Sequence, residues 1–351
     1  MRPNAVVRSQ SAHGQHLEAE IAEQPQVLAG LLRDGAAEIA TVAEQIRAYG
    51  PRFVLLAARG TSDHAALYAK YLTEVLLELP AGLASPSAVT VYGARPRLDG
   101  VLFVVISQSG RSPDLLAITT QARQRGALTV AVTNSPAAPL AAAARLHVNV
   151  RAGTERAVAA TKSYTAQLLA LYLLVEQLRG SDAADARHLP ELAAATLQAV
   201  AETAPRAADR YRFATRLITT GRGYSLPSAL EAALKLMETS YVSAQAFSAA
   251  DLLHGPLAMV DPLLPVIAFV PAGRGGQALD PVLARLGERG ADVLRVGPGP
   301  DCALRTPAGV PEALAPIVEI LPLQSLALHL ARARGQNPDA PRGLRKITET
   351  L

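Results

Sequence analysis

Short apolar runs alternate with amphipathic stretches along the chain, and each apolar run is followed by a polar loop. Residues 53–57, 101–106 and 264–269 form such runs, built mainly from aliphatic residues. Runs of this length are typical of strands that are covered on both faces of a parallel sheet. The stretches that follow the loops have helical periodicity, so the pattern predicts an α/β protein.

The strongest polar signal follows the strand predicted at 101–106. It reads SQSGRS at 107–112, and Pro113 then suits the first position of a helix with Ser112 as its N-cap. A helix start presents unpaired N–H groups and the positive end of the helix dipole, which together attract anions. The loop therefore predicts a phosphate site, although serine-rich turns also cap helices without binding a ligand.

The two halves of the chain contain a repeat. RGTS at 59–62 matches RGYS at 222–225, and the same offset carries the strand at 101–106 onto 264–269. We therefore predict two duplicated units, each a parallel sheet flanked by helices in a three-layer α/β/α arrangement. The second copy has PAGR at 271–274 where the first has SQSG, so a phosphate site is expected in the first copy only.

Composition breaks place the expected boundaries. The expected segments are an N-terminal tail with helices at 1–50, a first unit at 51–180, a helical linker at 181–210, a second unit at 211–335 and a C-terminal tail at 336–351. The tail is too rich in proline to be helical, so we expect it to lie over the surface or in a cleft.

Composition also narrows the classes of partner. The net charge of +4 is spread out, without a basic run or tryptophan, which argues against nucleic acid. Cys302 is the only cysteine, which suits a reducing cytoplasm. The most apolar predicted helix, 166–178, is interrupted by Gln167 and Glu176, so no membrane span is expected. His64, His147 and Cys302 lack ligand-like spacing, so we predict no metal. No cofactor is expected.

Three charged residues share one helical face. Glu231, Lys235 and Glu238 stand at positions i, i+4 and i+7. Spacing alone predicts a solvated stripe of salt bridges. In the same way, His254 before a turn is typical of a structural histidine, and Lys346 of a surface charge in a tail.

Several separated motifs together resemble one family. They are the SQSG loop, AGTERAVAATKSYT (152–165), ALEAALKLMETSY (229–241), DLLHGPLAMVD (251–261) and NPDAPRGLRK (337–346). The chain from about residue 17 to its end resembles the sugar isomerase (SIS) domain family, in particular the isomerase half of glutamine–fructose-6-phosphate aminotransferase. The resemblance implies two SIS units and a hexosamine or ketohexose 6-phosphate as the ligand.

The resemblance also implies roles for residues at matching positions. The phosphate would be held by Thr61, Ser107, Gln108, Ser109 and Ser112. Arg111 could contact the phosphate or could equally be a surface arginine. Backbone groups at 157–161, including Val158 and Ala160, would contact the sugar hydroxyls, which is the weakest of these assignments.

The resemblance implies catalytic roles for the same charged residues that spacing alone assigned to the surface. Glu238 would be the base that moves a proton between C1 and C2, and Lys235 would stabilise the neighbouring oxygen or keep that carboxylate ionised. His254 would open the sugar ring from a neighbouring subunit, which implies a homodimer with shared active sites. Lys346 would form a Schiff base with the keto sugar.

Two local departures refine the expected reaction. Arg59 and Arg111 stand where the aminotransferase usually has cysteine and glutamate. Separately, no glutaminase activity is expected, because the glutaminase domain of the aminotransferase uses a catalytic cysteine and the only cysteine here is Cys302. In these respects the chain is more similar to SIS-type glucosamine-6-phosphate deaminases, which form fructose 6-phosphate and ammonia. The alternatives are an ammonia-dependent glucosamine-6-phosphate synthase, another phosphosugar isomerase, a deglycase, and a phosphosugar sensor without catalysis. A sensor usually carries a DNA-binding domain, and residues 1–50 show no helix-turn-helix pattern.

Overall fold

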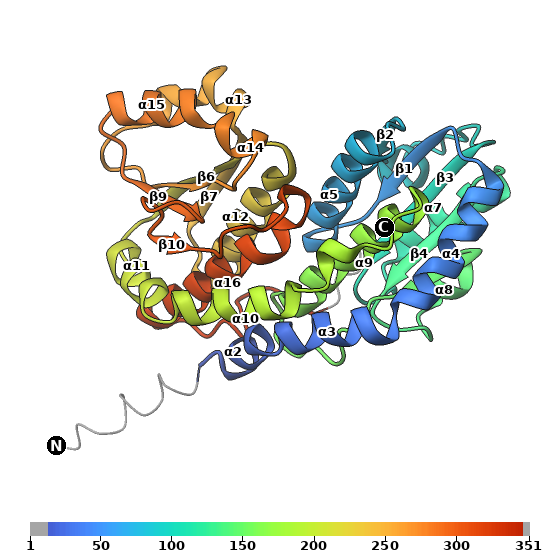
Figure 1. The fold of residues 1–351 in the computed structure, drawn as a ribbon, viewed down its shortest axis with the longest axis horizontal. Helices are drawn as coiled ribbons and strands as arrows, with labels where there is room; N and C mark the ends of the chain where they lie inside the picture. Colours follow the sequence, from blue (N-terminus) through green and yellow to red (C-terminus); the bar gives the residue numbers. More distant parts are fainter. Residues whose placement is uncertain (1–12, 347–351) are drawn as a thin grey trace. The chain divides into compact units, whose positions relative to one another are not determined.

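The computed structural model describes residues 13–346 and divides into two compact units (Figure 1). The first unit consists of Gln26–Glu155 and Lys162–His188. The second consists of Leu189–Lys346, the segment Arg156–Thr161 and the part of Met1–Pro25 that the structure describes. Each unit contains one five-stranded sheet.

The sheet of the first unit is parallel throughout, in the order β2-β1-β3-β4-β5. Its strands are β1 (Phe53–Ala57), β2 (Ala81–Leu83), β3 (Val101–Ser107), β4 (Leu128–Thr133) and β5 (Leu146–Asn149). Alternate side chains of β1 and β3 point to opposite faces, as the strand period of two requires. Val54 and Val104 face α4, α5 and α9, whereas Leu55 and Phe103 face α6 and α7.

The helices of the first unit lie before, between and after its strands along the chain. They are α3 (Gln24–Asp34, which begins in the second unit), α4 (Ala36–Tyr49), α5 (Thr61–Leu76), α6 (Pro86–Thr90), α7 (Pro113–Gln124), α8 (Pro139–Ala143), α9 (Lys162–Leu178) and the short η1 (Ala184–Ala186). Helix α7 begins at Pro113, as predicted, because proline at the first position needs no backbone N–H.

The sheet of the second unit repeats the same topology. Its order is β10-β9-β8-β6-β7, with β6 (Arg216–Gly221), β7 (Ser243–Ser248), β8 (Val266–Phe269), β9 (Val293–Gly297) and β10 (Leu304–Arg305), all pairs parallel. The predicted fold class is confirmed: two parallel sheets flanked by helices. The structure also has edge strands as short as two residues, which the apolar runs did not predict.

The helices of the second unit include the longest one in the described part of the chain. They are α2 (Gln15–Ala22), α10 (Leu189–Val200), α11 (Thr203–Tyr211), η2 (Gly223–Ser225), α12 (Leu226–Ser240), α13 (Ala249–Leu253), η3 (Pro256–Met259), α14 (Arg274–Gln277), α15 (Asp280–Glu288), η4 (Glu312–Leu314) and α16 (Ala315–Ala333). Helix α16 packs against α11 and α12.

One helical stretch in the described residues, Glu312–Ala333, is long and apolar enough to cross a membrane, with a mean hydropathy of 1.5. However, 83% of the 18-residue window with this hydropathy is buried inside the fold. A core helix has the same apolar composition, because its whole circumference contacts other side chains.

Candidate active site

The phosphate-loop candidates lie where the strand order of the first sheet reverses. Strands β1 and β3 are neighbours, but their onward connections run to opposite sides. Ligands of open parallel sheets bind outside the carboxyl ends of the strands at such a point. Thr61 begins α5 after β1, and Ser107 ends β3, so the structure brings both to this edge of the sheet.

The loop after β3 holds a fixed conformation. Gly110 has φ +60°, and a Cβ atom on it would lie 2.5 Å from Cβ of Ala138. The Gly110 N–H donates to Ser107 Oγ (3.2 Å), and the Arg111 N–H donates to Ser109 Oγ (3.3 Å). The turn after β4 also holds the loop, because the Asn134 N–H donates to the Gln108 carbonyl (3.1 Å). Backbone N–H groups therefore hold the side chains of Ser107 and Ser109 in position.

Ser112 occupies the N-cap position of α7, but its hydroxyl makes no capping hydrogen bond. That hydroxyl is therefore available to a ligand at the helix start. Arg111 is exposed, as the alternative of a surface arginine requires.

Sequence reasoning missed an ion pair beside this loop. Arg59 Nε donates to Asp114 Oδ2 (2.8 Å), and the Asp114 side chain is only 1% exposed. Asp114 also accepts from the Leu115 N–H in the first turn of α7. Two signals were available in the sequence: an acidic residue just after a helix start, and an arginine just after the neighbouring strand.

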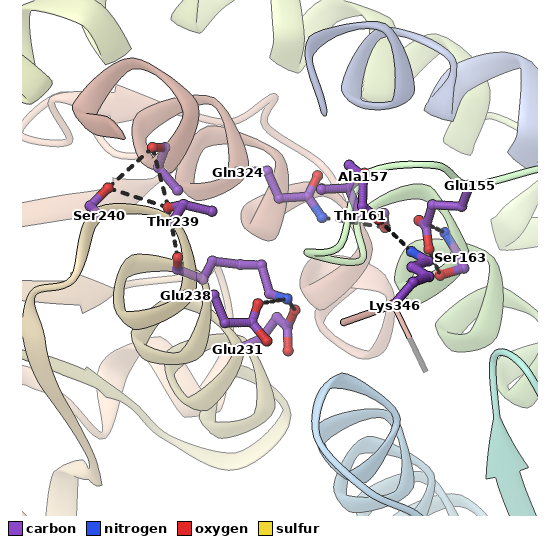
Figure 2. Close-up of polar contacts among 12 residues, drawn as sticks. Glu155, Ala157, Thr161, Ser163, Glu231, Glu238, Thr239, Ser240, Gln324 and Lys346 are labelled. Atoms are coloured by element: carbon purple, nitrogen blue, oxygen red, sulfur yellow. Dashed lines mark hydrogen bonds and ion pairs between the residues drawn. The ribbon is translucent and has the colours of Figure 1, made fainter. Parts of the chain in front are cut away.

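The charged face of Glu231, Lys235 and Glu238 lies on α12 in the second unit, and it is not solvated as its spacing alone predicted. Lys235 Nζ lies 2.5 Å from Glu238 Oε2 and 3.3 Å from Glu231 Oε1 (Figure 2). The side chains of Lys235 and Glu231 are 2% and 0% exposed, whereas that of Glu238 is 21% exposed. The solvated stripe that spacing alone predicted is wrong, because this face of α12 is turned into the protein.

The electrostatic balance of this cluster favours a charged lysine. Burial by itself would lower the pKa of Lys235, but the carboxylates of Glu231 and Glu238 more than offset that effect and raise it above its ordinary value. The result is a buried ammonium ion that holds one fully buried and one partly exposed carboxylate.

Lys346 and the sugar-contact loop meet within the second unit. Lys346 Nζ donates to the carbonyl of Ala157 (2.7 Å), as Figure 2 shows. Val158 and Ala160 are half-buried in the same loop, between buried Ala157, Ala159 and Thr161. The structure therefore places the tail lysine on the loop whose backbone groups are candidates for the sugar hydroxyls.

His254 stands apart from these groups. It follows α13, is exposed, and its backbone N–H donates to the Asp251 carbonyl (3.0 Å). Within residues 13–346, no hydrogen bond or ion pair links its ring to Glu238, Lys235 or Lys346.

The second copy of the phosphate loop contains a carboxylate of the protein itself. Glu312 accepts the backbone N–H groups of Arg274 (3.0 Å) and Gly275 (2.5 Å) after β8, the counterpart of β3. These backbone groups form the start of α14. In the second loop, these two backbone donors are thus paired with a side chain of the protein itself.

A second carboxyl group nearby is buried in the core. The Glu319 side chain is 2% exposed, and its Oε2 accepts from Ser225 Oγ (3.0 Å). Burial, with a smaller contribution from the charge of Glu312, raises the pKa of Glu319 to about 7, although the hydroxyls of Ser228 and Ser225 lower it.

The stability of the second unit should consequently fall as the pH rises through 7. The folded state binds the Glu319 proton more tightly than the unfolded state, whose pKa is near 4.5. This contribution is complete below pH 4.5 and is lost as the pH passes 7. Between pH 5 and 8, wild type should lose about 2–3 kcal/mol relative to Glu319→Gln in denaturant titrations. Parallel pH profiles for the two proteins would contradict the expectation.

Among residues 13–346, no three His, Cys, Asp or Glu side chains are grouped closely enough to hold a metal ion. Cys302 is buried, and burial raises the pKa of its thiol.

Comparison with known proteins identifies the family. The SIS domain pattern matches residues 15–177 and 211–334. The chain is 35% identical over 344 residues to glutamine–fructose-6-phosphate aminotransferase of Pyrococcus horikoshii, which covers 93% of this chain and 56% of that protein. The chain thus spans about half the length of the curated relatives that it matches.

Solved structures give the same result. A protein of Silicibacter pomeroyi assigned as a phosphosugar isomerase is 34% identical, with a TM-score of 0.84 over 92% of this chain and 99% of that chain. The C-terminal domain of the aminotransferase from Francisella tularensis is 27% identical, with a TM-score of 0.85 over 94% and 99%. Glucosamine-6-phosphate deaminase of Thermotoga maritima, at 21% identity and a TM-score of 0.82 over 96% and 100%, shares the fold. With the two repeated sheets and both matched segments, the chain belongs to the SIS domain family.

Proposed function

We propose that the protein is an aldose–ketose isomerase acting on an amino sugar 6-phosphate, and specifically a glucosamine-6-phosphate deaminase. The observation that carries the proposal is the Glu238 carboxylate, which is partly exposed and lies 2.5 Å from a buried ammonium group. A base for proton transfer must be reachable by substrate and held in place, and Glu238 meets both requirements.

The proposed reaction uses each group once. His254 of a partner subunit protonates the ring oxygen of the sugar while the C1 hydroxyl loses its proton, so the bond between C1 and the ring oxygen breaks and the aldehyde forms. Glu238 takes the proton from C2 of the aldehyde form and returns it to C1. Over the same step O1 gains one proton and the amino group at C2 loses one, which converts the amino aldose into a ketose imine. Water adds to the imine carbon at C2, and ammonia leaves to give fructose 6-phosphate.

Lys346 offers a second route for the last step. A neutral amine at Lys346 can replace ammonia on C2 by exchange, leaving a lysine Schiff base that water hydrolyses. The hydrogen bond to Ala157 supports this role, because it holds the amino group beside the loop proposed to contact the sugar hydroxyls.

The phosphate of the substrate is assigned to the loop after β3. Ser107, Ser109 and Ser112 supply hydroxyls there, and the start of α7 supplies the positive end of a twelve-residue helix. The main rival is an ammonia-dependent synthase working in the reverse direction. It is favoured by the 35% identity to aminotransferases, whereas Arg59 and Arg111 favour the deaminase.

The test is an assay of the pure protein with glucosamine 6-phosphate, in which ammonia and fructose 6-phosphate are measured together. The deaminase predicts equal amounts of both products. Fructose 6-phosphate with ammonium chloride should be tested in parallel, because net amination there would favour the synthase. Absence of ammonia from every hexosamine 6-phosphate tried would refute the deaminase.

A phosphosugar sensor is the rival from another class. It predicts binding of sugar phosphates, measured by calorimetry, without turnover of any of them. The buried Lys235 with two carboxylates argues against it, because binding alone does not require a charged cluster that costs desolvation energy.

A further inference from the structure

Two buried polar side chains from the start of the described chain have no place in the mechanism above. Glu20 in α2 is 4% exposed, and Gln24 at the start of α3 is 0% exposed. Buried polar groups are costly unless they are satisfied by hydrogen bonds, so their partners show what they do. Both belong to the second unit.

Glu20 holds the beginning of the Arg156–Thr161 loop. Its carboxylate accepts the backbone N–H of Arg156 through Oε1, and it accepts the N–H of Ala157 at 3.4 Å through Oε1 and 3.3 Å through Oε2. Around these contacts, Leu17 and Ile21 of α2 pack against Ala157, Ala159 and Leu328. The first two peptides of the loop are therefore fixed to α2.

Gln24 holds the end of the same loop through one intermediate. Gln24 Nε2 donates to Gln324 Oε1 (2.7 Å), and Gln324 Nε2 donates to the carbonyl of Thr161 (3.4 Å). Gln324 and Thr161 are drawn in Figure 2. Polar side chains at the α2–α3 junction thus fix the six-residue loop at both ends.

The peptide that Glu20 binds is also the one that binds Lys346. Ala157 donates its N–H to Glu20 and accepts from Lys346 Nζ through its carbonyl. Upstream in the tail, Asp339 accepts the backbone N–H groups of His16 (3.1 Å) and Leu17 (2.8 Å) in the first turn of α2. Helix α2 therefore contacts the tail directly at Asp339 and, through Ala157, at Lys346.

We propose that Glu20 is a positioning residue for Lys346: by fixing the Ala157 peptide it sets where the amino group of the tail lies. The inference rests on the proposed function for the chemistry of Lys346, but the contacts that it invokes can be tested without it. Asp339 fixes the beginning of the tail to α2. Glu20 fixes the Ala157 peptide, which binds Lys346 at the end of the described tail.

The test compares Glu20→Gln with Glu18→Gln. Glu18 lies two residues away in α2, is half exposed and pairs with Arg332 (2.7 Å), so the control removes a charge from the same helix without touching the loop. Hydrogen–deuterium exchange is measured for the 156–161 and 336–346 peptides. In Glu20→Gln the side-chain NH2 group can face the backbone N–H groups of Arg156 and Ala157, which are also donors, so exchange should be faster in both peptides. In Glu18→Gln the exchange rates of both peptides should stay near those of wild type.

The functional arm traps the Schiff base. Each variant is incubated with fructose 6-phosphate and borohydride, and modified Lys346 is counted by peptide mass spectrometry. Glu20→Gln should slow trapping roughly ten- to a hundredfold, as expected for a lost hydrogen bond to a charged group. Hexosamine 6-phosphate turnover should fall only by the share that passes through the lysine Schiff base. Binding of inorganic phosphate by calorimetry should change less than twofold, because a role limited to the tail leaves the loop after β3 intact.

The outcomes separate the two proposals. Unchanged tail exchange in Glu20→Gln, or faster exchange with wild-type trapping, overturns the positioning role. A wild-type protein that neither traps nor turns over any sugar phosphate overturns the proposed function, and tail exchange still decides the contact network. If Glu20→Gln does not fold, Glu20→Asp, which keeps the charge but draws the carboxylate back from the Ala157 N–H, should still speed exchange in both peptides.

Discussion

Replacement of Lys235 with methionine should destabilise the second unit by about 3–5 kcal/mol, the usual cost of removing one partner from a buried ion pair. Methionine fills similar space but leaves the fully buried carboxylate of Glu231 without the ammonium 3.3 Å away. Guanidinium denaturation, followed through the transition of the second unit, measures the loss.

Two variants make this expectation specific. Lys70→Met removes an i,i+4 lysine–glutamate pair whose side chains are 28% and 35% exposed, and it should cost about 0.3–0.5 kcal/mol. Lys235→Met combined with Glu231→Leu removes both buried charges and should recover much of the stability. Equal losses for Lys235→Met and Lys70→Met would show that the α12 cluster is solvated after all.

Replacement of Glu238 with glutamine should lower turnover of hexosamine 6-phosphate roughly 10²- to 10⁴-fold, the range usual for a lost general base. The change keeps the shape of the side chain, and Lys235 retains Glu231 as a partner, so the fold should survive. The affinity for the sugar phosphate should change little because the phosphate loop is untouched. Steady-state kinetics and calorimetry measure the two effects.

The matched control is Glu288→Gln, on α15 of the same unit, where the carboxylate is 64% exposed and pairs with Arg285 (3.4 Å). Its kinetics should equal those of wild type. Undiminished turnover in Glu238→Gln would assign the proton transfer to another group, while lost binding together with lost turnover would point to a structural role.

The parts of the fold that were predictable have strong local patterns. The strand at 101–106, the polar loop and Pro113 follow one another directly, so β3, the loop and α7 could be placed from the sequence. Strands β2 and β10 could not, because they are three and two residues long and are defined by their neighbours. Edge strands of that length have no periodicity to detect.

The candidate site shows a different limit. Spacing placed Glu231, Lys235 and Glu238 on one helical face correctly. However, an exposed stripe of salt bridges and a buried ionic cluster have the same spacing, so spacing cannot distinguish them. Burial depends on what covers the face, here including α16, whose Ala327 carbonyl accepts from Thr239 Oγ1 (3.4 Å). Likewise, Glu20 and Ala157 are separated by 137 positions, and no local pattern indicates that they meet.

The carboxylate of Glu312 gives the duplicated loops different sequence constraints. In the first copy, Gly110 makes room for Ala138, whose Cβ would lie 2.5 Å from a Cβ on this glycine. In the second, Cβ atoms at Gly273 and Gly275 would lie 2.4 Å and 2.6 Å from the Glu312 oxygens, so these glycines make room for an internal side chain. Glycines at matching positions of the two halves, such as Gly110 and Gly273, thus make room for different side chains. A count of such matching motifs would therefore overestimate the number of ligand sites in the chain.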